Sequence, residues 1–240
     1  MKDMMRREIV LSERMQMVAD MISRGNVLAD IGCDHGFVSI YLLEKGICPK
    51  VIAMDVNEGP LLRAKEHIDE RGLTSYIDVR LSNGMEKLLL GEADSILIAG
   101  MGGRLVIKIL TDSMEKAKQL KEIVLQPQSE IHLVRQFLRD CGFHILHEDM
   151  VKDNGKFYPA MRVVWREEKP RILLEEELWY GPLLLKEKHP VLREYLENER
   201  AKYAMIAEDI ANNGNNMDKS KENTVQRRRS LIDTALTYFT

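Results

Sequence analysis

Apolar and polar positions change their period several times along this chain. Short apolar runs, each of strand length, end at a glycine or a polar residue. We expect strands near residues 27–31, 50–54, 77–81, 95–99 and 122–126. Stretches with helical periodicity lie near residues 12–22, 36–45, 58–71, 103–118 and 130–141. This alternation of strands and helices predicts right-handed crossovers and a parallel sheet.

Two longer runs with strand character follow, at residues 143–151 and 156–166. They meet at Asn154-Gly155, a pair that strongly favours a tight hairpin turn. The sequence therefore predicts an α/β protein with a Rossmann-like fold, in which a mostly parallel sheet ends in an antiparallel hairpin.

The last part of the chain lacks strand signals and has a helical pattern. Leu196, Tyr203 and Ile210 recur at intervals of about seven residues, and a matching apolar stripe runs through residues 225–239. An asparagine-rich segment at 212–216 separates the two stretches and indicates a helix stop and a turn. We predict an antiparallel, coiled-coil-like helical hairpin.

Composition supports one catalytic unit with an appendage. At 240 residues, of which 45% are hydrophobic, the chain has the length of one or two domains. We predict a catalytic domain over residues 1–168 and a helical tail over 169–240. No window approaches the ~18 apolar residues of a membrane span, and the charged N-terminus differs from a signal peptide. We therefore expect a cytoplasmic protein without membrane association, and we favour a monomer.

Charge and cysteine content narrow the possible partners. The formal net charge of -3 gives no overall support for nucleic-acid binding, so any RNA contact must come from local basic patches. The candidates are Arg6, Arg7 and Arg14 near the N-terminus and the arginine run 227–229, for which a solvated helix face is an equally good interpretation. The three cysteines are an odd number and have no C-x-x-C spacing, which argues against both a disulfide framework and a zinc site.

The glycine loop after the first strand carries the most chemical information. Gly32 ends an apolar strand where the backbone turns into a helix, and Asp34 stands where a dinucleotide fingerprint would have its second glycine. A carboxylate there would repel a pyrophosphate, which disfavours NAD and FAD. S-adenosylmethionine (SAM) carries a sulfonium and an ammonium, so the acids Asp30 and Asp34 are compatible with it. A plain strand-to-helix turn is the alternative interpretation.

The next three strand ends repeat this pattern. Asp55 follows Gly32 by 23 residues, a spacing suited to a carboxylate that accepts hydrogen bonds from both ribose hydroxyls, although a helix-start role also fits. Asn83 occupies a position where many SAM enzymes have an aspartate that contacts the adenine amine. The segment 100–103, Gly-Met-Gly-Gly, can wrap a cofactor or admit a flat base, or it can be a compact helix start. The expected cofactor-binding residues are Asp30, Gly32, Asp55, Asn83, Gly100, Met101 and Gly102.

Several segments together resemble one family. They are Leu-Ser-Glu-Arg at 11–14, Ala-Asp-Ile-Gly at 29–32 with Asp34-His35, Glu-Gly-Pro at 58–60, Ile-Ala-Gly-Met-Gly-Gly-Arg at 98–104, Leu-Gln-Pro-Gln at 125–128 and Gly-Lys-Phe-Tyr at 155–158. This succession is similar to the bacterial tRNA (adenine(22)-N(1))-methyltransferase family, over essentially the whole chain. The chain departs from the family pattern at Cys33, Gly36 and Ser39, where Ser or Thr, Ala and Pro are expected.

The resemblance implies transfer of the SAM methyl group to N1 of an adenine in the D-arm of tRNA. This ring nitrogen has an in-plane lone pair, so the enzyme must position the base rather than remove a proton from it. Gly-Met-Gly-Gly after the fourth strand, in place of an acid or amide followed by two prolines, favours a ring nitrogen or a different acceptor over an exocyclic amine. We hypothesise that Asp34, His35 and Gln126 surround the reacting base beside Met101, with Tyr158 as a stacking wall. We predict that the helical tail and the basic residues Arg6, Arg7, Arg14, Arg104 and Lys156 contact the tRNA.

Two other functions fit parts of the pattern. A small-molecule SAM methyltransferase would share the cofactor loops and would use the tail as a lid. A non-catalytic RNA-binding protein would keep the fold without the chemistry, which the carboxylates of Asp30, Asp34 and Asp55 make less favourable. For His35, a helix-start residue that packs on the sheet is a purely structural alternative.

Overall fold

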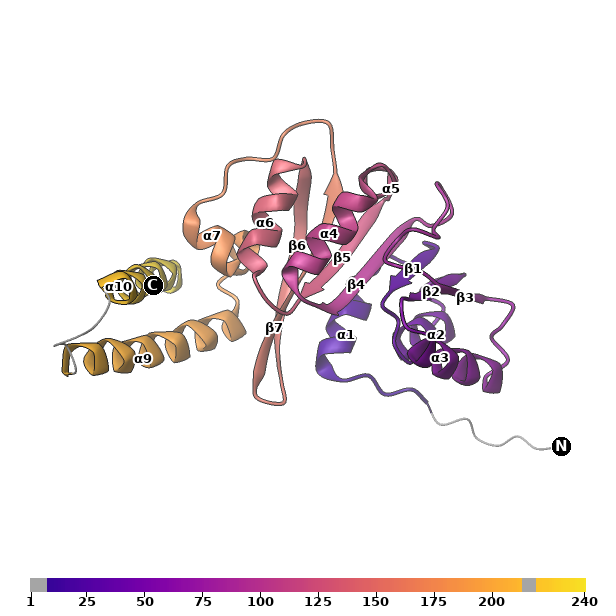
Figure 1. The fold of residues 1–240 in the computed structure, drawn as a ribbon, viewed down its shortest axis with the longest axis horizontal. Helices are drawn as coiled ribbons and strands as arrows, with labels where there is room; N and C mark the ends of the chain where they lie inside the picture. The colour runs from indigo at the N-terminus through magenta and orange to yellow at the C-terminus, as the bar shows by residue number, and fades with distance from the viewer. Residues whose placement is uncertain (1–7, 213–218) are drawn as a thin grey trace.

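The computed structural model describes residues 8–212 and 219–240. Its centre is a seven-stranded sheet with the strand order β3-β2-β1-β4-β5-β7-β6 (Figure 1). The strands are β1 (Leu28–Ile31), β2 (Val51–Asp55), β3 (Ile77–Leu81), β4 (Ser95–Met101), β5 (Glu122–Pro127), β6 (Phe143–Asp153) and β7 (Lys156–Trp165). Strands β1 to β5 are parallel, and β7 runs antiparallel to β5 and β6. The predicted sheet and its final hairpin are confirmed.

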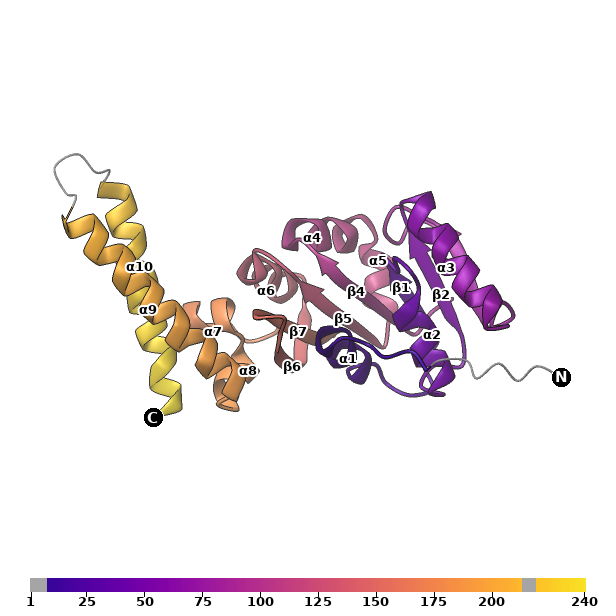
Figure 2. The ribbon, with the colours of Figure 1, turned by 90° about the horizontal axis from the view of Figure 1, so that it is seen from below.

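Helices cover both faces of this sheet (Figure 2). On one face lie α1 (Glu13–Asp20), α2 (Phe37–Glu44) and α3 (Glu58–Glu70), and on the other lie α4 (Gly103–Asp112), α5 (Met114–Gln119) and α6 (Ile131–Asp140). Successive strand residues alternate between the two cores: Leu28 packs on the first face and Ala29 on the second. Because both faces are buried, the central strands β1, β2, β4 and β5 are apolar along most of their length, whereas β3, β6 and β7 carry more polar residues.

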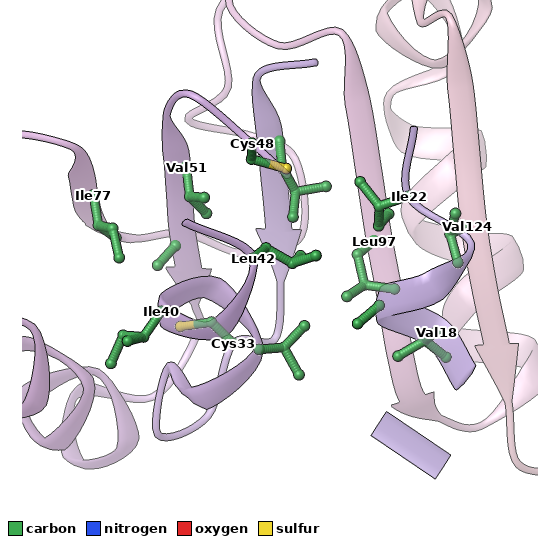
Figure 3. Packing of buried hydrophobic residues seen from close by; sticks show 14 of the residues in the cluster. Val18, Ile22, Cys33, Ile40, Leu42, Cys48, Val51, Ile77, Leu97 and Val124 are labelled. Atoms are coloured by element: carbon green, nitrogen blue, oxygen red, sulfur yellow. The ribbon is translucent and has the colours of Figure 1, made fainter. Parts of the chain in front are cut away.

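Figure 3 shows how the first core is assembled. Val18 and Ile22, from α1 and the turn after it, lie against Leu97 of β4 and Val124 of β5. Helix α1 begins where the sequence predicts, because the Ser12 hydroxyl accepts a hydrogen bond from the backbone N–H of Met15. The start of α1 lies beside the carboxyl end of β5, where Arg14 Nη1 donates to Gln126 Oε1 at 3.2 Å.

One predicted helix is wrong in its extent. The sequence suggests a continuous helix over residues 103–118, but the structure ends α4 at Asp112 and starts α5 at Met114. Ser113 lies between them in a non-helical conformation, with φ -130° and ψ 33°. The break falls in the run Thr111-Asp112-Ser113, whose short polar side chains compete with helical hydrogen bonds, and this local effect outweighs the apolar period.

Four α-helices make up most of the tail over the described residues 169–212 and 219–240. The predicted hairpin corresponds to α9 (Pro190–Asn212) and α10 (Lys219–Leu236), which pack side by side in both views, and a 3₁₀ turn (Thr237–Phe239) follows α10. Two short helices that the sequence pattern does not predict, α7 (Glu175–Tyr180) and α8 (Pro182–Lys186), precede this pair. The 212–216 turn falls mainly outside the described residues, and the coiled-coil character and the boundary after residue 168 stay predictions.

A buried ion pair joins the tail to the sheet domain. Arg135 of α6 donates from Nε to Glu148 Oε1 of β6 at 2.8 Å, and both side chains are almost completely buried, at 1% and 0% exposed. The same guanidinium donates from Nη1 to the backbone carbonyl oxygen of Leu178 at 2.9 Å, and Glu148 Oε2 accepts from the backbone N–H of Leu183 at 2.9 Å. We call this contact the junction pair.

Candidate cofactor and substrate crevice

A crevice of about 560 Å³ opens at the carboxyl ends of the central strands. The strand order reverses between β1 and β4, and the crevice lies at this point, where open α/β sheets bind their ligands. Most of the residues predicted from the sequence line it. They are Arg14, Asp30, Gly32, Asp34, His35, Asp55, Asn83, Gly100 and Met101.

The β1 loop adopts left-handed backbone conformations at three positions. The φ angles are 79° at Gly32, 49° at Asp34 and 74° at Gly36. A Cβ atom at position 32 would lie 2.3 Å from the terminal methyl of Met101, so glycine lets the β1 and β4 loops touch. Aspartate is among the side chains that tolerate such a conformation best.

The three predicted acids have different surroundings. Asp30 is buried, and its Oδ2 accepts a hydrogen bond from the Ser39 hydroxyl at 2.7 Å. Asp55 is also buried: it accepts from the backbone N–H groups of Asp34 at 3.3 Å and of Asn57 at 2.8 Å. The Asp34 side chain, by contrast, is 70% exposed. Two carboxylates therefore brace the loops, and the third is open to a ligand.

Burial raises the pKa of Asp30 to about 6, the hydrogen bond from Ser39 opposes this, and the nearby charge of Asp55 adds to it. Ser39 stands where the family pattern that the sequence resembles has a proline. In this chain the departure supplies the hydroxyl that stabilises the Asp30 carboxylate.

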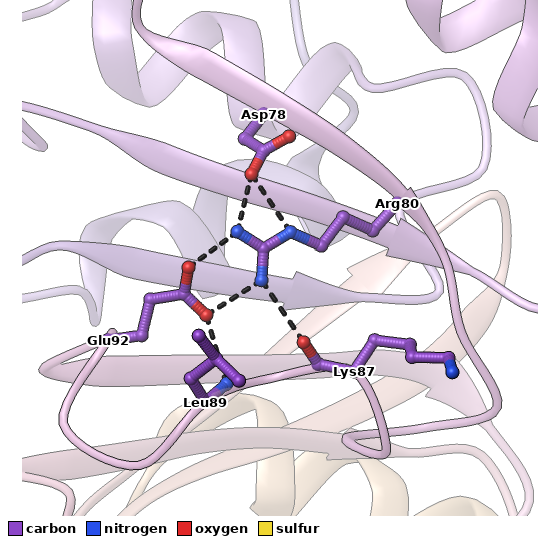
Figure 4. A network of polar contacts seen from close by, with 5 residues as sticks. All are labelled: Asp78, Arg80, Lys87, Leu89 and Glu92. Carbon is purple, nitrogen blue, oxygen red and sulfur yellow. Dashed lines mark hydrogen bonds and ion pairs between the residues drawn. The ribbon is translucent and has the colours of Figure 1, made fainter.

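Asn83 is exposed in the crevice, at the start of a loop that a polar network holds in place (Figure 4). Arg80 of β3 donates to the carboxylates of Asp78 and Glu92 and, at 3.1 Å, to the backbone carbonyl oxygen of Lys87. The hydrogen bond from Arg80 lowers the pKa of Glu92 to about 2. The network ties the segment after Asn83 to the edge strand of the sheet.

Gln126 and Tyr158 lie behind the crevice wall. Gln126 is fully buried, and its Oε1 accepts from Arg14 Nη1 and from the backbone N–H of Gly100, each at 3.2 Å. The Arg14 guanidinium carbon lies 5.2 Å from the centre of the Tyr158 ring. Neither Gln126 nor Tyr158 lines the crevice, whereas Arg14 does. In this structure both residues support Arg14, and their direct contact with a base stays a prediction.

Phe37 and Gln128 are among the crevice-lining residues that the sequence does not single out as site residues. Phe37 is the first residue of α2 and stacks on His35, with ring centres 5.8 Å apart and an interplanar angle of 5°. Gln128 stands two positions after Gln126 and is exposed. The motif Gln-Pro-Gln contains both amides, and only the fold reveals which of the two faces the crevice.

The predicted RNA-contacting residues are dispersed. Arg104 and Lys156 are exposed and lie outside the crevice lining, and Arg104 forms an ion pair with Glu130 at 2.6 Å. Arg228 is packed over the Trp179 ring, 4.0 Å from its centre, so this member of the 227–229 run holds the tail together. Arg6 and Arg7 lie outside the described residues.

Residues 8–212 and 219–240 contain no group of three or more His, Cys, Asp or Glu side chains placed to hold a metal ion. Over the same residues, the longer helices are too polar to cross a lipid bilayer.

The chain that forms this crevice is similar in sequence to known methyltransferases. Residues 11–161 match the family described as "Methyltransferase domain". The chain is 33% identical to the tRNA (adenine(22)-N(1))-methyltransferase of Bacillus subtilis over 222 residues, which cover 90% of this chain and 93% of that protein. The chain belongs to this methyltransferase family.

Solved structures of similar proteins extend the match to the fold. The M1A22 tRNA methyltransferase TrmK of B. subtilis superposes with a TM-score of 0.84 at 31% identity, covering 95% of this chain and 100% of that one. TrmK of Mycoplasma capricolum, solved with S-adenosylhomocysteine, gives a TM-score of 0.83 at 26% identity, covering 96% and 99%. The likeness therefore includes the helical tail as well as the sheet domain.

Proposed function

We propose that this chain is a SAM-dependent methyltransferase that modifies N1 of adenine 22 in tRNA. The observation that carries the proposal is the acid-lined crevice at the carboxyl ends of β1, β2 and β4, in a chain that matches a tRNA (adenine(22)-N(1))-methyltransferase over nearly its full length. The crevice and the family membership support the same reaction.

The residues of the crevice suit SAM. A volume of about 560 Å³ is within the usual range for a small-molecule site. We assign Asp55 to the ribose hydroxyls and Asn83 to the adenine, with Asp30, Gly32, Gly100, Met101 and Gly102 around the remainder of the cofactor. When bound, SAM supplies an electrophilic methyl group on a positively charged sulfur. The exposed Asp34 carboxylate adds an electrostatic preference for a cation over a phosphate.

The chain must then orient the adenine. N1 of a neutral adenine already has a lone pair, so the protein has to hold it in line with the methyl group and keep water away. We assign Asp34 to the developing positive charge on the purine, where a fixed anion lowers the barrier. His35 stands beside it, with Nε2 at 3.6 Å from Asp34 Oδ1. Arg14, held by Gln126 and the Tyr158 ring, also lines the crevice.

The tRNA body needs contacts outside the crevice, because turning a base out of its stack costs a few kcal/mol. We assign these contacts to Arg104, Lys156, the N-terminal arginines and the tail. The predicted cytoplasmic location and monomeric state are compatible with a tRNA substrate and stay predictions. Removing the tail is a poor test of these contacts, because Met150 and Phe157 of the sheet domain pack into the tail core and would be uncovered.

Methyl transfer to matched RNAs tests the proposal. The protein is incubated with methyl-labelled SAM and an unmodified tRNA transcript, and the modified nucleoside is mapped; a transcript with guanine at position 22 is the control. We expect 1-methyladenosine at position 22 in the first transcript and no label in the second. Label at another position, or equal label in both transcripts, contradicts the assigned target. A calorimetric titration in which SAM gives no heat of binding would contradict a catalytic role.

A further inference from the structure

We propose that Phe37, together with His35 and His67, forms a stacking platform for a nucleobase that neighbours the target adenine in the substrate RNA. We call these three rings the rim platform. The proposal rests on the proposed function, because it specifies how that same crevice receives a folded RNA. Neither the family match nor the sequence motifs give Phe37 or His67 a role. His35 has only the catalytic role assigned above.

The three rings form a compact stacked cluster, in which each ring lies 4.8 to 6.0 Å from the other two. The Phe37 and His67 ring centres are 4.8 Å apart with an interplanar angle of 22°, and those of His35 and His67 are 6.0 Å apart at 25°. A polar contact fixes the arrangement, since His67 Nδ1 lies 3.0 Å from the backbone carbonyl oxygen of His35. The stack joins the β1 loop to α3, and Gly36 brings the two elements close: a Cβ there would lie 3.2 Å from the Ala64 Cβ.

The stack faces solvent at the edge of the crevice. Phe37 is 45% exposed, although the α2 residues Val38, Ser39, Ile40 and Leu42 that follow it are buried. Phe37 and His35 both line the crevice, so the platform continues its wall outward. An aromatic ring is not needed to start a helix, and a large apolar ring left half exposed beside a binding crevice is best explained by a ligand that covers it.

The chemistry of the platform favours a base over a phosphate. Flat aromatic and imidazole rings stack nucleobases, and this is the usual way in which proteins hold unstacked bases of RNA. The exposed Asp34 carboxylate lies 3.6 Å from His35 Nε2 and repels phosphate groups. When the target base leaves its stack, its neighbour loses a stacking partner. A protein ring at the crevice mouth replaces that partner and thereby offsets part of the cost.

The test compares three variants of the full-length protein. Phe37→Ala removes the phenyl ring of the platform, and Phe37→Tyr keeps an aromatic ring there. Tyr76→Ala removes a ring of similar exposure, 54% against 45%, that lies outside the crevice lining. We expect Phe37→Ala to raise the KM for tRNA about tenfold or more, as the loss of one base-aromatic stack would. Phe37→Tyr and Tyr76→Ala stay within about twofold of the wild type. The SAM dissociation constant, measured by calorimetry, and the melting temperature stay unchanged.

A fluorescence measurement observes the stacked base directly. 2-Aminopurine is placed in the tRNA at either nucleotide that flanks the target adenine. Binding to the wild type should quench one of the two probes, and Phe37→Ala should abolish that quenching. An unchanged tRNA KM with unchanged quenching in Phe37→Ala overturns the platform. So does a weakened affinity for SAM, which would assign the ring to the cofactor. Wild-type protein that methylates no tRNA contradicts the proposed function itself.

Discussion

The crevice and the junction pair both place charged side chains inside the protein, but they treat those charges in opposite ways. At the junction, every strong polar atom of Glu148 and most of those of Arg135 have a partner, and both side chains are shielded from water. At the crevice, Asp34 is open to solvent and Asp30 is buried with a single side-chain hydrogen bond. A satisfied charge fixes the structure, whereas an exposed or incompletely balanced one is available to a ligand.

The largest effect on stability should come from breaking the junction pair. Arg135→Met leaves Glu148 buried without its partner, so we expect the free energy of unfolding to fall by about 3–5 kcal/mol in urea denaturation. The double variant Arg135→Met/Glu148→Met should recover most of this loss, because no buried charge remains. Arg193→Ala, which breaks an exposed pair with Glu197, is the control and should cost at most about 1 kcal/mol. If Arg135→Met lowered the free energy of unfolding by less than the control does, the charge of Glu148 would not be buried.

At the crevice, the equivalent change should affect the reaction and not the fold. Asp34→Asn removes the charge, and asparagine keeps the left-handed conformation that this position requires. We expect kcat for methyl transfer to fall about 100- to 1,000-fold, as it does when a group that stabilises developing charge is lost. The melting temperature should not change. A wild-type rate in this variant would remove Asp34 from the catalytic site.

The raised pKa of Asp30 gives a prediction for pH. Because its pKa is about 6 in the folded protein and 3.8 in the reference state, the folded state binds the proton more tightly. The contribution of Asp30 to stability is therefore present at low pH and is lost as pH rises from about 4 to about 6. We expect Asp30→Asn to flatten this part of the stability curve and to leave the variant about 1–3 kcal/mol more stable than the wild type at pH 8. A wild-type pH profile in Asp30→Asn would show that the carboxyl is not desolvated.

A smaller effect separates backbone strain from close packing. Gly181 has a φ of 97°, and a Cβ there would lie 2.7 Å from Glu148 Oε2, whereas Gly155 has a φ of 75° and open space around it. Alanine at either position lowers the stability, because a residue with a Cβ is strained at a positive φ. Only Gly181→Ala also disturbs the junction pair. We expect Gly181→Ala to be less stable than Gly155→Ala by about 1–2 kcal/mol in urea denaturation. Equal losses would mean that the junction tolerates an added methyl group.

The sequence predicts the strands of the sheet and the crevice residues at the ends of those strands. Strand ends are readable because burial on both faces makes the strands apolar up to a glycine or an acid, as at Gly32 and Asp55. The carboxyl ends of parallel strands converge, so residues at those ends are correctly expected to line one crevice. Asp30, Asp34 and Asn83 were found in this way, together with the β4 loop.

Other features depend on contacts that no local pattern records. Arg135 and Glu148 lie on different elements, and each looks like a surface charge in its own segment. Phe37 follows the glycine loop and has the appearance of a core residue until the turn of α2 shows it half exposed. Ser113 interrupts a helix whose apolar period continues on both sides. In each case the tertiary arrangement decides between two locally acceptable structures.

A crystal structure of the protein with S-adenosylhomocysteine tests the central claim most directly. We predict that the nucleoside lies in the crevice between the ends of β1, β2 and β4, with the ribose hydroxyls within hydrogen-bond distance of the Asp55 carboxylate. An empty crevice, or a ligand bound elsewhere on the molecule, would contradict it.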